Sequence, residues 1–472
     1  EGSCRALRIP LLSMIRLLSI VCVLHDAALG STLLSSADSF HCFVSDVGGE
    51  VRCWGENSKN QLGQGHTDRI DDLSGLPAID LGQTMKVKSL ALGSRNRHMC
   101  AVLENGKLKC WGRNEWGEVG SEGSADVVQM GDSLPAVDVG TSVEEVVEVA
   151  CSRWATCAIL DPAVLKCWGR GKFGASGYED STDRGQDPST MGDSLPTVNL
   201  GFSYTVLSVG LGQQFACALL DPGGCVKCWG KNVDKWYDMG NVNIGADANT
   251  MGDHLPCLDF SGTAGSIAVG WQSVCAILTD GIVKCFGETL DSVELGGDCE
   301  PEQLCSGDGF HCALCSSNVK CWGYGDDLGY EDSLDRGVVE NDYRMGNNLP
   351  FVSLGNDGSP ELLSCSTTTC VVTNEHAIKC WGDGDPLELD STASTVGNGA
   401  DTMGDNLPVI NFGGVRASFI TPATTPAITT ATTTTTTTTT TRTTASATTT
   451  TTTTATTTAT TTATTTATTT AT

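Results

Sequence analysis

Basic side chains are scarce in this sequence. Its 28 Lys and Arg residues face 56 Asp and Glu residues, so the formal net charge is -28. Such an acidic chain is a poor match for the positive surface that a duplex phosphate backbone requires, and we expect no nucleic-acid partner. Long apolar runs are also missing, since none reaches the roughly 18 to 20 residues of a membrane-spanning helix. The sequence has no Gly-x-Ser-x-Gly elbow, no phosphate loop and no His-Glu-x-x-His motif, so we expect no enzyme and no cofactor.

Cysteine and glycine are abundant, with 23 and 55 copies, and the cysteines follow a repeat. The tripeptide Cys-Trp-Gly begins at Cys53, Cys110, Cys167, Cys228, Cys321 and Cys380, and Cys-Phe-Gly begins at Cys285. A second cysteine precedes each tripeptide by 9 to 11 residues, at Cys42, Cys100, Cys157, Cys217, Cys275, Cys312 and Cys370. The tripeptides are 57, 57, 61, 57, 36 and 59 residues apart, so the chain contains seven copies of one unit.

Each unit reads as four short strands. In the second unit, apolar segments cover Val87–Gly93 and Met99–Leu103, and Glu104–Lys107 contains the Asn-Gly pair typical of a hairpin turn. Leu108–Gly112 returns, and after a polar insert Leu134–Gly140 closes the unit. Because one such sheet cannot cover both of its own faces, seven of them predict an all-β fold, a seven-bladed β-propeller of four-stranded antiparallel blades. We expect each repeat Trp to pack between blades.

The first 30 residues have the features of a leader containing a signal peptide. Arg16 precedes an apolar stretch, Leu17–Leu24, and Ala28–Gly30 supplies small residues for a signal peptidase. We expect cleavage after Gly30; the alternative is a buried N-terminal helix.

The propeller is expected over residues 31–420, followed by a tail, residues 421–472, that is almost entirely Thr and Ala. Such a composition cannot form a packed core. It is typical of a mucin-like stalk carrying O-linked sugars, and an unmodified flexible tail is the alternative.

The repeat resembles a known family, the regulator of chromosome condensation repeat, in its cysteine-rich, alpha-tubulin-suppressor-like form. The resemblance lies in the order Cys-Ala, hairpin turn, Lys-Cys-Trp-Gly, Asn/Gly-rich stretch and Leu-Pro-x-Val-Asp-Leu-Gly. Asn57–Gly63 carries the family's Asn-x-x-Gly-Gln-Leu-Gly stretch with Asn60 at the usual Gly position, and Arg113–Gly120 is a looser copy. The resemblance implies a seven-bladed propeller. Family members include a nuclear exchange factor for a small GTPase, ubiquitin-ligase regulators and light sensors, so fold transfers better than function.

The two repeat cysteines of each unit face each other across a hairpin, where opposed residues come close enough for a disulfide. We therefore predict seven disulfides, Cys42–Cys53, Cys100–Cys110, Cys157–Cys167, Cys217–Cys228, Cys275–Cys285, Cys312–Cys321 and Cys370–Cys380. Such bonds persist outside the cell, which agrees with a leader; buried reduced thiols are the alternative.

Seven further cysteines have no predicted partner: Cys151, Cys225, Cys257, Cys299, Cys305, Cys315 and Cys365. Their odd number implies at least one free or intermolecular thiol if the rest are paired. Two Cys-x-x-Cys spacings, Cys225–Cys228 and Cys312–Cys315, each use a repeat cysteine, so we expect neither to be a metal or redox site. His41, His98 and His311 recur at one repeat position, which indicates an architectural role.

Long acidic inserts separate the tripeptide from the Leu-Pro segment in six units, and most end in Met-Gly-Asp or Met-Gly-Asn. Equivalent loops of a propeller emerge on one face, so the inserts predict an acidic rim with a notch at the unit of Cys275, which has no insert. The candidate binding residues on this rim are Glu179, Asp180, Asp183, Glu331, Asp332 and Asp335. A cationic protein or peptide is the functional interpretation; a solvated surface and a calcium site are the alternatives.

The resulting hypothesis is a secreted or cell-surface, monomeric propeller without catalytic activity, which binds protein or peptide partners through its loop faces. A cytoplasmic or nuclear regulator of a small GTPase, with guanine-nucleotide exchange activity, is the second hypothesis. An enzyme whose catalytic groups converge only in three dimensions is the third.

Overall fold

A computed structural model describes residues 34–37, 39–45, 49–82, 86–91, 96–143, 145–231, 243–287, 292–338, 342–383 and 395–413. The predicted leader, residues 1–30, and the predicted tail, residues 421–472, lie outside these residues. No helix within the described ranges is both long enough and apolar enough to cross a membrane.

The described residues form seven antiparallel sheets of three or four strands. In chain order their strands are β1 (Leu34–Ser36), β2 (Phe40–Val44), β3 (Val51–Gly55); β4 (Val87–Leu90), β5 (His98–Leu103), β6 (Leu108–Gly112); β7 (Val146–Cys151), β8 (Ala155–Leu160), β9 (Val164–Gly169); β10 (Thr205–Leu211), β11 (Phe215–Asp221), β12 (Cys225–Gly230); β13 (Ala264–Val269), β14 (Val274–Leu278), β15 (Val283–Phe286), β16 (Ser292–Val293); β17 (Pro301–Ser306), β18 (Phe310–Cys315), β19 (Asn318–Gly323); and β20 (Pro360–Cys365), β21 (Thr368–Thr373), β22 (Ile378–Asp383), β23 (Thr395–Val396).

Short 3-10 helices lie in the inserts and connections. They are η1 (Gly131–Ser133), η2 (Lys172–Gly174), η3 (Pro188–Thr190), η4 (Gly192–Ser194), η6 (Gly252–His254), η7 (Gly325–Asp327), η8 (Gly346–Asn348) and η9 (Gly404–Asn406).

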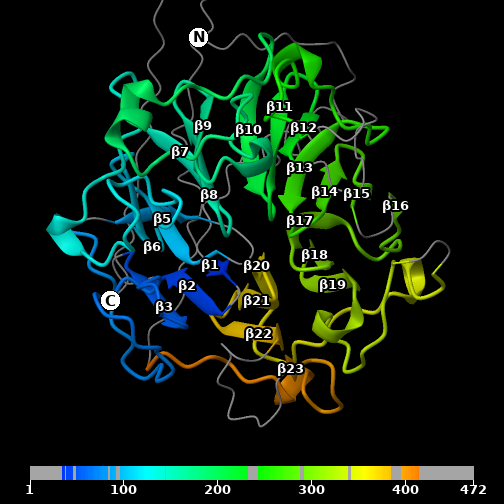
Figure 1. Ribbon diagram of the computed structural model, residues 1–472. Coiled ribbons are helices and arrows are strands. Elements are labelled where there is room, and N and C mark those ends of the chain that lie inside the picture. The colour runs from blue at the N-terminus through cyan, green and yellow to red at the C-terminus, as the bar shows by residue number, and fades with distance from the viewer. Residues whose placement is uncertain are drawn as a thin grey trace, which may run out of the picture. The chain divides into compact units, whose positions relative to one another are not determined.

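The sheets follow one another around a common centre (Figure 1), and first strands of neighbouring sheets contact each other, as β10 and β13 do and as β17 and β20 do. The first and last sheets meet, because Ser36 of β1 donates its backbone N–H to the hydroxyl of Ser364 on β20 at 3.0 Å. On the other side, the hydroxyl of Ser35 donates to the carbonyl of Ala91, just after β4, at 2.7 Å. This closed arrangement of antiparallel sheets is a β-propeller, and it covers both faces of each sheet.

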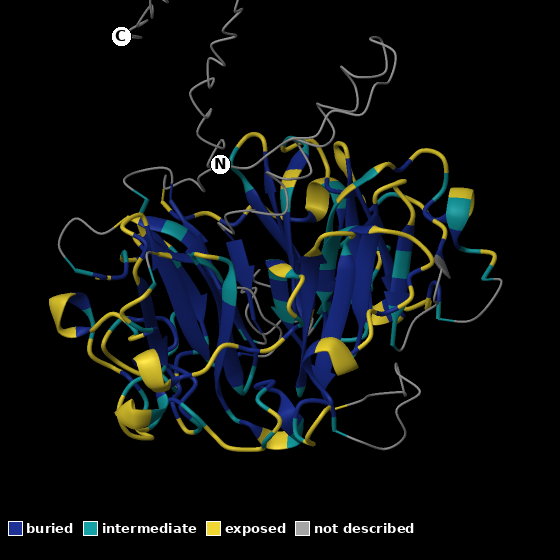
Figure 2. Cartoon of the chain, turned by 90° about the horizontal axis from the view of Figure 1, so that it is seen from above, coloured by how far each residue is buried: buried dark blue, intermediate teal, exposed yellow. Residues whose placement is uncertain are grey.

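The core consists of the strands, which are buried along most of their length, while the exposed residues gather in the loops (Figure 2). Six repeat tryptophans are at most 1% exposed: Trp54, Trp111, Trp168, Trp229, Trp322 and Trp381. Trp168 donates its indole N–H to the carbonyl of Glu118 in the preceding unit at 3.0 Å, so it ties neighbouring units together. Gly120, with φ at +73°, makes room for it, since a Cβ there would lie 3.0 Å from the indole nitrogen.

The expected fourth strand is regular in one sheet among the described residues, where β16 supplies it. The other fourth strand, β23, lies in the insert of the last unit, ahead of its Leu-Pro segment, and pairs with the end of β22. In the second unit the segment predicted for this role, 134–140, lies outside the strands and makes one ladder-like bond, from Val137 N to Leu108 O at 2.8 Å. Pro135 is part of the reason, because proline has no N–H to donate to a ladder. The segment still runs along the outer edge of β6 and covers it.

A buried lysine on the third strand holds the inserts against the sheets. The ammonium of Lys166 donates to the carbonyl of Val139 at 2.8 Å and to that of Gly192 at 2.9 Å. Gly192 belongs to a Met-Gly-Asp sequence, has φ at +61°, and a Cβ there would meet the carboxylate of Asp138 at 2.5 Å. The same two-carbonyl arrangement recurs at Lys109, Lys227 and Lys379. The repeated Met-Gly-Asp sequence therefore has a structural role in positioning a carbonyl.

The repeat cysteines are disulfide-bonded within every hairpin, with Cα–Cα distances of 4.0 to 4.1 Å. Three further disulfides join Cys225 to Cys257, Cys299 to Cys315 and Cys305 to Cys365. These bonds leave Cys151 as the free thiol among the described cysteines, and it is buried.

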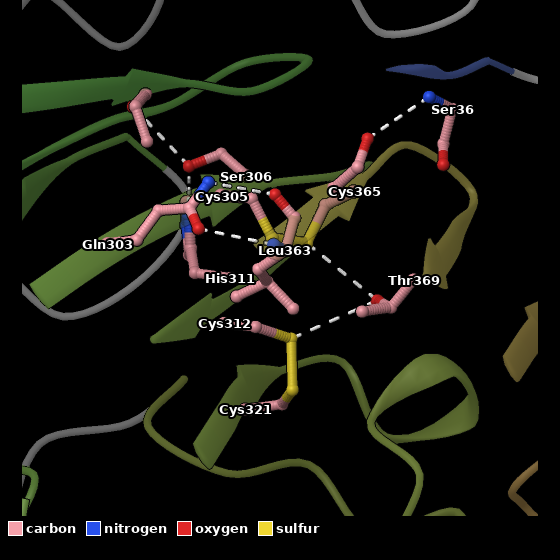
Figure 3. The surroundings of a disulfide bond; sticks show 12 residues. Ser36, Gln303, Cys305, Ser306, His311, Cys312, Cys321, Leu363, Cys365 and Thr369 are labelled. Atoms are coloured by element: carbon pink, nitrogen blue, oxygen red, sulfur yellow. Dashed lines mark hydrogen bonds between the residues drawn. A yellow bond between two sulfur atoms is a disulfide. The ribbon is translucent and has the colours of Figure 1, made fainter. Parts of the chain in front are cut away.

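The Cys305–Cys365 disulfide joins β17 to β20 and so links two different sheets (Figure 3). Beside it, Gln303 donates to the carbonyl of Leu363 at 3.0 Å and accepts from the N–H of Leu363 at 3.1 Å. The covalent bond and the side-chain ladder together fasten these neighbouring sheets near the centre of the propeller.

Candidate partner-binding face

The strand directions bring two kinds of loop to the same end of each sheet. The connection between the first and second strands and the segment that leaves the third strand are neighbours, as the bond from Arg170 N to Trp154 O at 2.8 Å shows. The hairpin between the second and third strands lies at the opposite end. We call the first end of the propeller the crossover face and the other end the hairpin face.

A basic–aromatic cluster, consisting of Arg113, Trp116, Arg153, Trp154, Arg170 and Lys172, lies on the crossover face across the second and third sheets. The guanidinium of Arg113 lies 4.6 Å from the ring centroid of Trp154, and that of Arg153 lies 4.9 Å from it. Arg170 is 4.9 Å from the same ring and 4.4 Å from the ring of Trp116. Each pair is within the range of a cation–π contact.

Glu118 contacts two members of this cluster, Arg113 and Trp116. It is fully buried, and its carboxylate accepts the backbone N–H of Trp116 at 2.7 Å. Burial raises the pKa of Glu118 to about 7, although the nearby Arg113 acts in the opposite direction. Arg113 also donates to the exposed carboxylate of Glu115, and this bond lowers the pKa of Glu115. Arg113 is therefore neutralised locally, and its main role is to support the ring of Trp154.

Arg170 and Lys172 are in a different situation. Within the described part of the chain neither side chain makes an ion pair, and Lys172 is exposed. Both line a hollow between the third and fourth sheets, together with Trp154, Gln213 and Gln214. The residues around this shallow hollow bring two positive charges, an indole and two side-chain amides to one part of the crossover face.

An acidic cluster, consisting of Asp308, Asp326, Asp327 and Asp383, occupies the same face of the sixth and seventh sheets. Burial raises the pKa of Asp327 to about 7, and the charges of Asp383, Asp326 and Asp308 add to the effect. The crossover face therefore carries charge of opposite sign on its two sides.

The predicted acidic rim residues are engaged within the propeller. Glu179 accepts the backbone N–H groups of Thr250 and Met251 at 2.8 and 3.0 Å, and so reaches from the third unit to the fourth. Glu331 accepts the N–H groups of Thr402 and Met403, both at 2.9 Å. These two glutamates connect adjacent inserts.

The neighbouring aspartates order their own inserts. Asp180 pairs with Arg184 at 2.7 Å, and Arg184 lies over the ring of Tyr178 at 4.4 Å. Asp183 accepts the N–H of Gly171 at 2.8 Å. In the sixth unit, Asp332 pairs with Arg336 at 2.9 Å, and Asp335 accepts the N–H of Gly325 at 3.0 Å. Binding of a partner through these six carboxylates stays a prediction, and it competes with these intramolecular contacts.

The three repeat histidines are completely buried, and burial lowers the pKa of each to about 3. His98 contacts the hydroxyl of Thr156 at 2.8 Å, and His311 contacts that of Ser306 at 2.8 Å. His41 stacks on Trp54 with 5.0 Å between centroids. The histidines thus fill positions in the core, as their recurrence indicated.

Among the described residues, three sets of sulfur and imidazole groups lie close enough together to hold a metal ion: His98 with Cys100 and Cys151, Cys275 with Cys285 and His311, and Cys305 with Cys312 and Cys365. Every cysteine in them except Cys151 is in a disulfide. Because metals bind thiolates, these sets do not provide the ligands of a metal site in the oxidised protein.

Sequence reasoning missed the basic–aromatic cluster. A signal was present, because Arg113 and Arg170 each directly follow a Cys-Trp-Gly tripeptide in a chain that has few basic residues, and Arg153 precedes Trp154. Only the fold shows that these residues, spread over 60 positions, meet at one end of neighbouring sheets.

Comparisons with known proteins agree with the fold. A family model, the regulator of chromosome condensation (RCC1) repeat, matches residues 87–117. The chain is 26% identical over 317 residues to the ultraviolet-B receptor UVR8 of Arabidopsis thaliana, covering 62% of this chain and 65% of that protein. It is 28% identical over 255 residues to the human E3 ubiquitin-protein ligase HERC2, covering 52% of this chain and 5% of the ligase. The chain spans less than two thirds of the length of either relative.

Among solved structures, Prp20p from Saccharomyces cerevisiae, a protein described together with its binding to Gsp1p and histones, superimposes with a TM-score of 0.56 at 16% identity. The match covers 79% of this chain and 87% of Prp20p. Human WBSCR16 gives a TM-score of 0.54 at 18% identity, covering 71% of this chain and 83% of that one. The chain is therefore a β-propeller that is similar to those of RCC1-repeat proteins.

Proposed function

We propose that this protein is a non-catalytic, secreted or cell-surface propeller that binds a protein partner through its crossover face. The observation that carries the proposal is the basic–aromatic cluster, an assembly of guanidinium groups and indoles on an otherwise strongly acidic molecule. Arginine and tryptophan are the residue types that dominate the binding energy of protein interfaces. The relatives of this fold support a protein-binding scaffold, and the ten disulfides favour an oxidising compartment.

Site-specific photo-crosslinking tests the binding face. A photoreactive amino acid replaces Gln213, beside the cluster, and in a matched variant it replaces Lys107 on the hairpin face. Both proteins are exposed to the surface and secreted fractions of the native cells. We expect a discrete protein adduct at position 213 that is competed by unlabelled protein and is missing at position 107. Equal adducts at both positions, or none at 213, would overturn the proposal.

Intact mass before and after reduction, with thiol labelling, tests the compartment. Protein expressed from Met14 in a secretory host, and the protein from its native cells, should both be cleaved near Gly30. The described cysteines should then yield ten disulfides and one thiol. Glycan mass on the Thr-rich segment would agree with a secreted stalk. An uncleaved chain with free thiols in the native cells would instead favour the intracellular GTPase regulator.

A further inference from the structure

We propose that the basic–aromatic cluster recognises an acidic peptide segment, a stretch rich in Asp and Glu. This inference rests on the proposed function, because it specifies the chemistry of the partner that binds the crossover face. It is the reverse of the cationic partner that the acidic inserts suggest.

The first argument is the state of Arg170. Its guanidinium carbon lies 4.4 Å from the ring centroid of Trp116 and 4.9 Å from that of Trp154, and these two contacts restrict the position of the group. Because cation–π contacts do not use the N–H donors of a guanidinium, the arginine remains able to bind a carboxylate in a bidentate manner. Held in this way, it loses less conformational freedom on binding than a free side chain does.

The second argument is the composition of the hollow. Lys172 supplies a second positive charge on the same hollow, and its ammonium lies 4.7 Å from the ring centroid of Phe173. Gln213 and Gln214, on the connection between β10 and β11, can donate to peptide carbonyls. An acidic peptide segment matches this set of groups.

The third argument is the acidic cluster on the far side of the same face. Asp308, Asp326 and Asp383 repel any polyanion that extends across the propeller, so the favourable region for a negative ligand is short. A nucleic-acid strand requires an extended positive track along its backbone, which this face does not offer over the described residues. The charge pattern therefore favours a short acidic peptide segment.

Fluorescence anisotropy tests the inference with a fluorescein-labelled nine-residue peptide in which pairs of glutamates alternate with single leucines. The comparison ligands are the same peptide with lysine in place of glutamate, and an oligothymidylate of equal length. We expect binding of the glutamate peptide alone, and weaker binding as salt rises. Substitution Arg170→Gln should weaken it about tenfold, as for loss of one charge-assisted hydrogen-bonded pair.

Lys172→Gln, at an exposed position, is the second variant and should weaken binding about threefold. Lys107→Gln on the hairpin face removes the same charge and should leave binding unchanged. Equal binding of the oligothymidylate, or unchanged affinity in both Arg170→Gln and Lys172→Gln, would overturn the inference. If the crosslinked protein partner still binds these variants at full affinity, the proposed function stands and the acidic-peptide inference fails.

Discussion

The glutamate contacts between inserts allow a quantitative prediction about stability. Truncating Glu179 to Ala removes the acceptor of two backbone N–H groups in the next unit, at 2.8 and 3.0 Å. Hydrogen bonds to a charged group contribute about 1.5–3 kcal/mol each when buried, and less when water can replace the carboxylate. Because Glu179 is itself exposed, we expect Glu179→Ala to lower the free energy of unfolding by about 2 kcal/mol.

The repeat supplies an internal check on this value. Glu331 makes the same pair of contacts, both at 2.9 Å, so Glu331→Ala should have an equal effect. The two sites share no hydrogen-bond partner, and the double variant should therefore lose about 4 kcal/mol, the sum of the two. Glu179→Gln keeps an acceptor oxygen without the charge and should lose about half as much as the Ala variant.

Urea unfolding of the oxidised protein, followed by tryptophan fluorescence, measures these differences. Glu122→Ala, at an exposed glutamate of the second insert, is the matched control and should change stability by less than about 0.5 kcal/mol. If Glu179→Ala and Glu331→Ala unfold at the same urea concentration as the control, the contacts between inserts contribute nothing and the reasoning is refuted.

Three further predictions concern buried groups. Asp327→Asn should raise the midpoint of thermal unfolding at pH 8 and have little effect near pH 4. Folding raises the pKa of Asp327 to about 7, so the ionised carboxylate destabilises the folded protein. This destabilisation is complete above about pH 7 and disappears below the unfolded pKa of about 3.9. Lys166→Met should lower the free energy of unfolding by about 2–3 kcal/mol in urea, because two buried carbonyls lose their donor. Cys151 should resist a thiol reagent in the native protein and react fully in urea, because it is buried and burial raises its pKa to about 12.

Each of these has a result that would contradict it. An Asp327→Asn gain of equal size at pH 4 and pH 8 would mean that ionisation is not the cause. Unchanged stability in Lys166→Met would show that water replaces the ammonium as the hydrogen-bond donor to the carbonyls of Val139 and Gly192. Rapid labelling of native Cys151, with the disulfides intact by mass, would place that thiol at the surface.

Much of the fold could be predicted because each unit repeats the same local sequence pattern of strands, turn and cysteines. The Asn-Gly turn before Leu108 and the two cysteines around it predict one hairpin, and seven copies predict a propeller of antiparallel sheets. The buried tryptophans follow from the same repetition. The outer strand was harder to predict. Pro135 and its equivalents occur in an extended segment that lies along the outer edge of the third strand and bonds to it through a single backbone hydrogen bond.

The candidate site was much less accessible to sequence reasoning. Glu179 and Asp180 have the appearance of free surface charges, yet one caps the next insert and the other pairs with Arg184. The partner of Glu179 lies up to 72 positions away in the sequence. The partner of Asp180 lies on the same loop, whose irregular backbone has no sequence periodicity from which the contact could be predicted. The pairing of Cys305 with Cys365 could not be predicted from the sequence for the same reason, since this disulfide links one sheet to the next.

The amino-acid sequence by itself determined the unit and its hairpin, because these depend on residues about ten positions apart, and it determined the number of copies by repetition. The repeat tryptophans were predicted to be buried from their recurrence, but the partner of each one, such as Glu118 for Trp168, lies in a neighbouring unit. Tertiary structure alone decided which charges are free and which are paired, and it brought Trp116, Trp154 and Arg170 together from neighbouring units. The physical reason is the closed ring of sheets: it aligns equivalent loops of different units on one face, where side chains distant in sequence stack, repel or neutralise one another.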